Sequence, residues 1–255
     1  MMELKMFEQW LFEASDYKYG DLETIFDDLV EYTKMVIAGK QPALLVTGSP
    51  GTGKSYLIQK QLDMAGLKED TDYVIIKGKS SAAGMYMSLY EHNGKLIVYD
   101  DCDSIFKDDN SLLVLKGALD SSKVRKISWV VGKALKNANG ENIPQKFIFT
   151  GRVIFITNMA QRKIDDAIKS RTLIIEIALS PLDMVKHINN KLKDIEPDEP
   201  IELKQLALNT IQGVAKKNKD VQVNLRTLVK AIAILKNEDS LKVARRMIID
   251  QCSYE

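Results

Sequence analysis

A glycine-rich run of eight residues carries the clearest chemistry in this chain, because it ends in a lysine and a serine. The run starts at Gly48 and ends with Lys54 and Ser55, and it fits the phosphate-loop pattern G-x-x-x-x-G-K-[ST] at every required position. Glycines let the backbone turn tightly and aim N–H groups inward, and a helix N-terminus adds its positive dipole, so a polyphosphate can be held there. The pattern predicts that Lys54 reaches the β- and γ-phosphates and that the Ser55 hydroxyl holds Mg²⁺.

The segments on either side predict the elements that would position this run. Residues 42–47 read as a short buried strand, and residues 56–62 read as the helix that follows it. This context favours a nucleoside triphosphate site over the alternative, a plain glycine-rich turn between a strand and a helix. The predicted nucleotide contacts are Gly48, Ser49, Pro50, Gly51, Thr52, Gly53, Lys54, Ser55 and Tyr56.

Two neighbouring carboxylates end a second apolar strand, at Asp100 and Asp101. We expect Asp100 to join Ser55 in holding Mg²⁺, because this ion prefers oxygen ligands and the acid at such a strand end can complete its shell. Asp101 would then polarise an attacking water, with Asp103 as a reserve candidate. The alternative is a strand followed by a solvated acidic loop.

Composition limits the class of protein. The chain has 255 residues, which suits one large domain or a large and a small one, and its 45% hydrophobic and 28% charged content is ordinary for a globular protein. With a net charge of +1, any nucleic-acid surface has to be a local patch. Cys102 and Cys252 lack metal-ligand spacing and read as reduced thiols, which predicts a cytoplasmic location. No apolar run approaches the roughly 20 residues that span a bilayer and the N-terminus lacks a signal-peptide core, so we expect no membrane role without a partner.

Short apolar strands alternate with helical stretches between residues 43 and 178, which indicates an α/β fold with a parallel sheet covered by helices. Residues 1–40 read as helical, with Asp21 as a helix cap, and after Pro181 only amphipathic helices follow. We therefore predict a core over residues 1–181 and an all-helical domain over 182–255. The expected strands are Ala43–Thr47, Tyr73–Lys77, Leu96–Tyr99, Val153–Thr157 and Leu173–Ile177, and the expected late helices are Leu182–Leu192, Ile201–Ala215, Leu225–Leu235 and Leu241–Ile249.

These features together resemble an AAA+ ATPase over about residues 15 to 250. The phosphate loop is shared by all P-loop proteins, whereas the acidic strand, the strand ending at Asn158 and the helical C-terminal domain choose the family. Residues 98–104 and 115–121, with Ile127-Ser-Trp129, are similar to poorly characterised AAA+ proteins of bacteriophages and prophages. The resemblance implies a helix-sandwiched sheet with a helical lid, hydrolysis of ATP with Mg²⁺, and a homo-oligomer, usually a hexameric ring.

The resemblance also implies roles for three further residues. Asn158 takes the sensor-1 position, on a strand between the phosphate-loop and acidic strands, where it would help position the water. Arg171 takes the arginine-finger position and would reach the γ-phosphate of the neighbouring subunit, with Arg152 and Arg162 as rivals. Arg226 takes the sensor-2 position. The alternatives are an Asn that starts a turn, an Arg that complements a helix C-terminus, and an Arg on a solvated face. The predicted catalytic residues are Lys54, Asp100, Asp101, Asn158 and Arg171.

One departure from the family concerns the acid pair. The family usually has Asp-Glu where this chain has Asp100 and Asp101. A shorter side chain places the second carboxylate about one methylene further from the water, so hydrolysis could be slow or rely on a compensating shift.

Basic residues suggest a polymer that the ring could act on. The loop over residues 77–84 lacks the aromatic-hydrophobic-glycine core of many protein unfoldases, and its lysines could touch nucleic-acid phosphates. Residues 124–131 and 146–150 could pair as a hairpin around Trp129, with a turn at 137–142, and basic residues around an aromatic suit single-stranded DNA. The alternative is a hairpin whose lysines are only solvated, with Trp129 in the core. The predicted DNA contacts are Lys77, Lys79, Lys123, Arg125, Lys126 and Trp129, with Lys133 and Lys136 in the same stretch.

The leading hypothesis is therefore an oligomeric Mg²⁺-dependent ATPase that remodels DNA, translocates on it or loads factors onto it in phage-type replication, in the host cytoplasm. A second hypothesis keeps the ATPase and makes the substrate a protein, as in a remodeller or assembly chaperone. A third is a nucleotide-dependent scaffold with slow turnover. A nucleoside kinase fits the phosphate loop equally well but leaves the helical domain unexplained.

Overall fold

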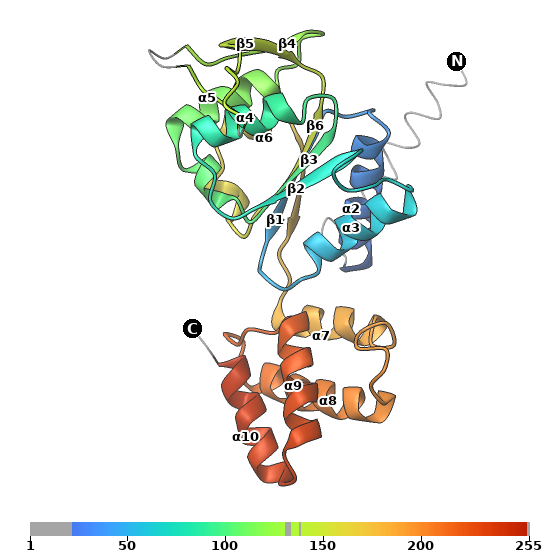
Figure 1. Ribbon diagram of the computed structural model, residues 1–255. Coiled ribbons are helices and arrows are strands. Elements are labelled where there is room, and N and C mark those ends of the chain that lie inside the picture. The colour runs from blue at the N-terminus through green and yellow to red at the C-terminus, as the bar shows by residue number, and fades with distance from the viewer. Residues whose placement is uncertain (1–21, 131–133, 138, 254–255) are drawn as a thin grey trace, which may run out of the picture.

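A five-stranded parallel sheet forms the centre of the first part of the chain (Figure 1). The structure is a computed structural model that describes residues 22–130, 134–137 and 139–253. The strands lie in the order β2-β3-β6-β1-β7, and every neighbouring pair is parallel. The strands are β1 (Ala43–Gly48), β2 (Tyr73–Lys77), β3 (Leu96–Asp100), β6 (Arg152–Ile156) and β7 (Leu173–Ile177).

Helices cover both faces of this sheet, so its strands are apolar on both sides. Successive residues of β1 show the alternation, because Leu44 packs toward one helical layer and Leu45 toward the other. One layer holds α2 (Leu22–Ile37) and α3 (Lys54–Met64). The other layer holds α4 (Ala82–Glu91), α5 (Asp109–Ala118) and α6 (Asp166–Lys169), with the short turns η1 (Asp103–Phe106) and η2 (Gln161–Lys163) nearby in sequence.

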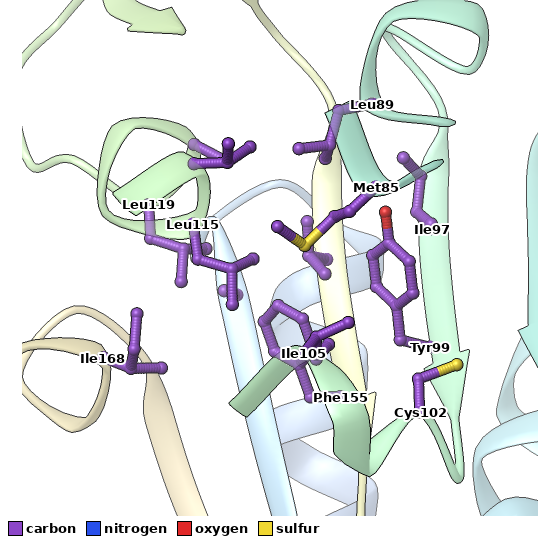
Figure 2. Close-up of a cluster of buried hydrophobic side chains, with 14 of the residues drawn as sticks. Met85, Leu89, Ile97, Tyr99, Cys102, Ile105, Leu115, Leu119, Phe155 and Ile168 are labelled. Carbon is purple, nitrogen blue, oxygen red and sulfur yellow. The ribbon is translucent and has the colours of Figure 1, made fainter. Parts of the chain in front are cut away.

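The core on the second face is built around aromatic and long aliphatic side chains (Figure 2). The rings of Tyr99 and Phe155 stack with centroids 5.6 Å apart, and Met85 and Leu115 close over them from α4 and α5. The Tyr99 hydroxyl is 2.6 Å from Ser88 Oγ, so its polar end is satisfied inside the core. This packing fixes β3 and β6, whose carboxyl ends carry the acidic and amide residues described below.

A two-stranded antiparallel hairpin lies at the end of the molecule farthest from the C-terminal helices (Figure 1). It consists of β4 (Arg125–Ser128) and β5 (Lys146–Phe149), with Ile127 opposite Phe147. The predicted hairpin is thus present in shorter form, and its expected end at Val131 lies outside the described residues.

Four helices after residue 180 pack on one another around a separate hydrophobic cluster. Ser180 caps the first of them by accepting a hydrogen bond from Asp183 N, and Pro181 occupies its first turn. The ring of His187 stacks on Phe26 of α2 with centroids 3.8 Å apart, and burial lowers the pKa of His187 to about 4. The helices are α7 (Pro181–Asn190), α8 (Ile201–Lys217), α9 (Leu225–Asn237) and α10 (Leu241–Cys252).

The predicted α/β fold class, a parallel sheet between helices followed by a helical C-terminal part, is confirmed. The expected loop over residues 77–84 is shorter than predicted, because Ser81 caps α4 and the helix begins at Ala82. Of the helical region expected before residue 40, α2 is observed, whereas Asp21 lies outside the described residues. Within the described part of the chain, no helix is both long and apolar enough to span a bilayer.

Candidate functional site

The phosphate loop connects β1 to α3 at the carboxyl edge of the sheet, facing the C-terminal helices (Figure 1). Gly48 has a φ of 135°, and a Cβ there would lie 2.3 Å from the carbonyl oxygen of Ile177, so this position requires glycine. Gly53, in a left-handed conformation, precedes α3 and has no side chain to cap the first N–H groups of the helix. Those N–H groups therefore point toward the place where a phosphate would bind.

Lys54 connects the loop to two other elements of the site. Its buried Nζ donates to Gly48 O at 2.9 Å, to Ser49 O at 2.7 Å and to Asn158 Oδ1 at 3.1 Å. Asn158 Nδ2 in turn donates to Asp101 Oδ1 at 2.7 Å. The structure thus brings together three of the predicted catalytic residues, which come from α3 and from the ends of β6 and β3.

Burial lowers the pKa of Lys54 to about 8, although the charges of Asp101 and Asp100 act to raise it. The contacts of Lys54 to loop carbonyls are those that a triphosphate could replace, because phosphate oxygens carry full negative charge and carbonyl oxygens do not. Asn158 follows the end of β6 by two residues, and β6 pairs with both β1 and β3. The expectation that its strand lies between the phosphate-loop and acidic strands is confirmed.

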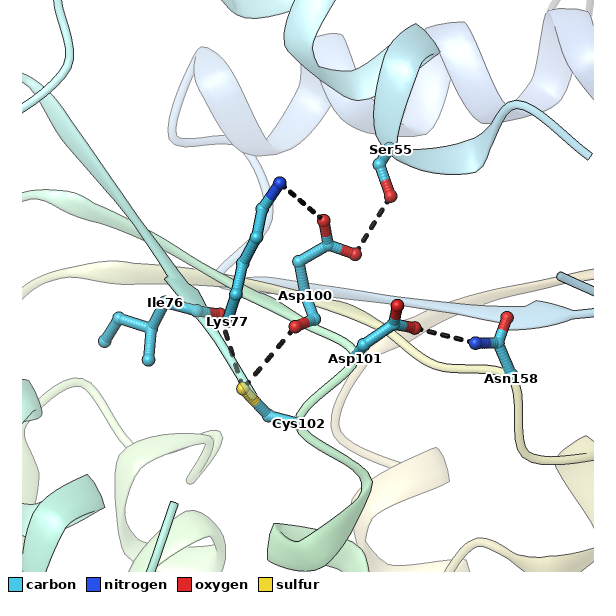
Figure 3. A network of polar contacts seen from close by, with 7 residues as sticks. All are labelled: Ser55, Ile76, Lys77, Asp100, Asp101, Cys102 and Asn158. Carbon is cyan, nitrogen blue, oxygen red and sulfur yellow. Dashed lines mark hydrogen bonds and ion pairs between the residues drawn. The ribbon is translucent and has the colours of Figure 1, made fainter. Parts of the chain in front are cut away.

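Ser55 and Asp100 meet as the sequence predicts (Figure 3). Ser55 Oγ donates to Asp100 Oδ1 at 2.9 Å, and the Asp100 side chain is 8% exposed. Lys77 Nζ lies 3.5 Å from the other carboxylate oxygen of Asp100. Asp101, the next residue, adopts a left-handed φ of 57° and donates its N–H to Ile156 O, which turns its side chain toward Asn158.

This pair suits Mg²⁺, which is usually bound by one or two carboxylate or hydroxyl oxygens together with phosphates and water. Among the described residues, no group of three or more His, Cys, Asp and Glu side chains could hold a metal by itself. The metal would therefore bind with the nucleotide. Asp103, the reserve candidate, instead accepts a hydrogen bond from Thr157 at the end of β6.

The N-terminus of α9 rests directly on the phosphate loop. Leu225 N donates to Gly51 O at 2.9 Å, and a Cβ on Gly51 would lie 2.8 Å from Asn224 Cγ. Asn224 Oδ1 also accepts from Thr227 N at 3.0 Å, so this side chain caps α9 while it packs on the loop. The helical part of the chain therefore contacts the loop through backbone and side chain.

Two cavities flank the loop at this contact. A cavity of about 200 Å³ is lined by Lys54, Tyr56, Asn158 and Arg226, which places the predicted sensor-2 arginine in the same cavity as Lys54. A second cavity, of about 260 Å³, also borders the loop. Its lining includes Pro50, Leu179, Met184 and Gln222.

Arg171 lies at the opposite edge of the sheet. Leu173, where β7 begins, pairs with Leu44, whereas Ile177 pairs with Gly48. At about 3.3 Å per residue, these pairs separate the start of β7 from the phosphate loop by about 13 Å. Within one chain, the structure therefore does not bring Arg171 to Lys54.

The cavity at this amino edge has a volume of about 710 Å³ and is lined by three arginines. Arg171 Nη1 donates to Ala167 O at 2.7 Å, in the preceding turn. Arg152 donates to the carbonyls of Val36 and Ile37 at the end of α2. Arg152, an alternative candidate for the arginine finger, thus holds α2 against β6. Arg125 is the third arginine of this cavity.

Arg125 and Trp129, two of the predicted DNA contacts, are half-buried and face the inner side of the hairpin, where they contact the protein itself. Arg125 donates to Ala118 O at 3.1 Å and to Gly151 O at 2.7 Å, and burial lowers its pKa. Trp129 packs on Tyr86 with ring centroids 5.8 Å apart. Its Nε1 is buried with no hydrogen-bond partner among the described residues. The exposed lysines of the predicted set are Lys77, Lys79, Lys123, Lys126 and Lys136, while Lys133 lies outside the described residues.

Comparison with known proteins adds a phage relative. No family model matches the chain. An uncharacterised 36.7 kDa protein from the nrdC–mobD intergenic region of Enterobacteria phage T4 is 33% identical over 159 residues. The match covers 59% of this chain and 48% of the relative, so the chain spans about half the length of that protein.

Among solved structures, the chain is similar to PCH-2 of C. elegans, with a TM-score of 0.40 and 9% identity. That alignment covers 92% of this chain and 68% of the other. A likeness of this size says nothing about activity.

Proposed function

We propose that this protein is a Mg²⁺-dependent ATPase of the AAA+ type that works as a homo-oligomeric ring, with residues 1–181 as the ATPase core and 182–255 as the lid. One observation carries the proposal: the line of contacts from Lys54 through Asn158 to Asp101, beside the Ser55–Asp100 pair. A nucleotide-binding turn alone would not need a carboxylate held by an amide next to the lysine.

Each residue has a separate task in this proposal. Lys54 and the loop N–H groups hold the phosphates, and Ser55 and Asp100 would hold Mg²⁺, which offsets charge on the transferred phosphoryl group. Asp101 accepts a proton from the attacking water, and Asn158 keeps that carboxylate and the water in line. Arg226 contacts the phosphates of its own subunit from the lid.

A second copy is needed to complete the site. Arg171 lies at the edge of the sheet opposite the loop, so it can reach a γ-phosphate only in a neighbouring subunit. A guanidinium there would stabilise charge in the transition state. This placement supports a closed ring, for which we propose six subunits.

Phosphate release and nucleotide binding, measured separately, test the ATPase proposal. The unmodified chain should release phosphate from ATP only with Mg²⁺. Lys54→Ala should lose nucleotide affinity, while Asp101→Asn should keep affinity and lose turnover by roughly a hundredfold, as expected on removal of a general base. Turnover that survives in Asp101→Asn, or binding that survives in Lys54→Ala, would contradict these roles.

For the substrate, we propose that the ring acts on DNA in phage-type replication in the host cytoplasm. The support is the exposed lysines of the hairpin and of the loop after β2, together with the phage relative. Lys123→Glu with Lys126→Glu should weaken binding of single-stranded DNA at low salt and reduce its stimulation of ATP hydrolysis. If DNA neither binds to the protein nor stimulates its ATP hydrolysis, the result favours the alternative of a protein remodeller. Assembly by ATP without phosphate release would instead favour a scaffold with slow turnover.

A further inference from the structure

We propose that Lys77 is a built-in counter-cation for Asp100 that competes with the divalent metal, so that metal binding displaces this lysine from the site. The inference rests on the proposed function, because it takes Asp100 as a metal ligand. It adds a competitor for the metal at Asp100, a point that the proposed function leaves open.

The register of the sheet creates this contact. Lys77 is the last residue of β2 and Asp100 the last of β3, and they are direct partners in the parallel pairing. Lys77 Nζ is 3.5 Å from Asp100 Oδ2, while Oδ1 accepts the Ser55 hydroxyl (Figure 3). Both carboxylate oxygens are therefore engaged before any metal arrives.

A buried carboxylate needs a compensating charge, and Lys77 supplies it by contact. The Asp100 side chain is 8% exposed, whereas that of Lys77 is 67% exposed. Lys54, the other nearby ammonium, directs its hydrogen bonds to Gly48 O, Ser49 O and Asn158. Among the described residues, Lys77 is consequently the lysine in ion-pair contact with Asp100.

A divalent cation at Ser55 and Asp100 would place a second positive charge next to the ammonium of Lys77, and like charges repel. Lys77 can leave readily, because its flexible stem is already mostly in water. Exposed ion pairs are weak, so the competition should change metal affinity by roughly two- to fivefold. The alternative is that Lys77 stays in place and orients Asp100 for the metal. Removal of Lys77 would then lower the metal affinity and not raise it.

Binding of Mn²⁺ in the presence of a non-hydrolysable ATP analogue, followed by electron paramagnetic resonance, measures this sign without any turnover. Lys77→Met should bind Mn²⁺ roughly two- to fivefold more tightly than the unmodified chain at low salt, and the gain should shrink at high salt. Lys77→Arg keeps the positive charge and should therefore bind Mn²⁺ with the same affinity as the unmodified chain. The matched control is Lys79→Met, an exposed lysine two residues later, which should change little.

The outcomes separate the two proposals. If the unmodified chain binds neither the analogue nor Mn²⁺ with it, the proposed function fails and the inference with it. If it binds both, but Lys77→Met has equal or weaker Mn²⁺ affinity, the inference alone is overturned. An equal gain in Lys79→Met would also overturn it, because the effect would then reflect net charge and not the contact with Asp100. A thermal unfolding curve for each variant confirms that the titrated protein is folded.

Discussion

The two edges of the parallel sheet carry similar charged residues but use them differently. At the carboxyl edge, Lys54 and Asp101 contact loop carbonyls and the amide of Asn158, partners that a nucleotide could replace. At the amino edge, Arg125 and Arg152 donate to backbone carbonyls of separate segments. One edge is arranged so that a ligand can reorganise it, and the other mainly holds the fold together.

Arg171 differs from its two neighbours at the amino edge. Its guanidinium donates to Ala167 O in α6, four residues earlier, whereas Arg125 and Arg152 each join segments that are distant along the chain. Releasing Arg171 breaks one hydrogen bond within a single turn of the chain, which should cost roughly as much as one ordinary hydrogen bond. It is therefore the arginine of this edge that best suits the proposed contact with a neighbouring subunit.

The largest expected effect comes from Arg171→Ala. ATP hydrolysis should fall by about a thousandfold or more, because an arginine that stabilises the transferred phosphoryl group typically contributes that much. Nucleotide affinity should stay near that of the unmodified chain, since Arg171 lies far from the loop of its own subunit. Steady-state phosphate release and a titration with a fluorescent nucleotide measure the two quantities. Loss of nucleotide binding by the monomeric variant would contradict the assignment.

The lowered pKa of Lys54 predicts a pH effect specific to the carboxyl edge. Its pKa is about 8 in the folded protein, below the ordinary lysine value of 10.5 that applies to the unfolded chain. Between these values the unfolded chain binds more protons at Lys54, so the free energy of unfolding should rise with pH across this window. The rise is at most roughly 3 kcal/mol, from the pKa difference. Denaturant titrations from pH 7 to 10.5 should show it relative to Lys54→Met, and a constant difference between the two proteins would refute it.

Arg152→Ala should instead change stability. The substitution removes the side-chain donor of the Ile37 carbonyl and one of the two donors of the Val36 carbonyl, and it should lower the free energy of unfolding by about 1–3 kcal/mol. Urea denaturation measures this loss. Arg171→Ala is the matched control and should lose much less. If the two variants are equally destabilised, the distinction between the three arginines fails.

Most of the fold could be predicted because it is local. The phosphate loop, the apolar strands and the change to helices after Pro181 are short-range patterns, and the structure moves the bounds of the predicted strands and late helices by three residues at most. The pairing of Ser55 with Asp100 followed from residue types at strand and helix ends. The sequence also contains a pattern that predicts the inward position of Arg125 and Trp129. They alternate with Lys126 and flank Ile127, which is apolar and buried, so period two places them on the inner face.

The contacts that sequence reasoning missed depend on register and on packing between distant segments. Lys77 meets Asp100 only because β2 and β3 pair in one register, and a slip of one residue would turn Lys77 to the other face. Asn224 reads as a helix cap in the sequence, and nothing local shows that it also packs on Gly51. These are the contacts that connect the phosphate loop and the metal site to the rest of the molecule.

Asn224 gives the smallest and most specific test of the carboxyl edge, because its two contacts can be separated. Asn224→Ala removes the cap of α9 and should lower the free energy of unfolding by about 1 kcal/mol, whereas Asn224→Ser keeps a capping oxygen and should lose only a few tenths. Both substitutions remove the amide that packs on Gly51. If that contact positions the loop, both should weaken nucleotide binding to a similar small extent, although only one is destabilised. Urea denaturation and nucleotide titration measure the two effects. An Asn224→Ser variant with unchanged nucleotide affinity would show that the C-terminal helices do not position the loop through this side chain.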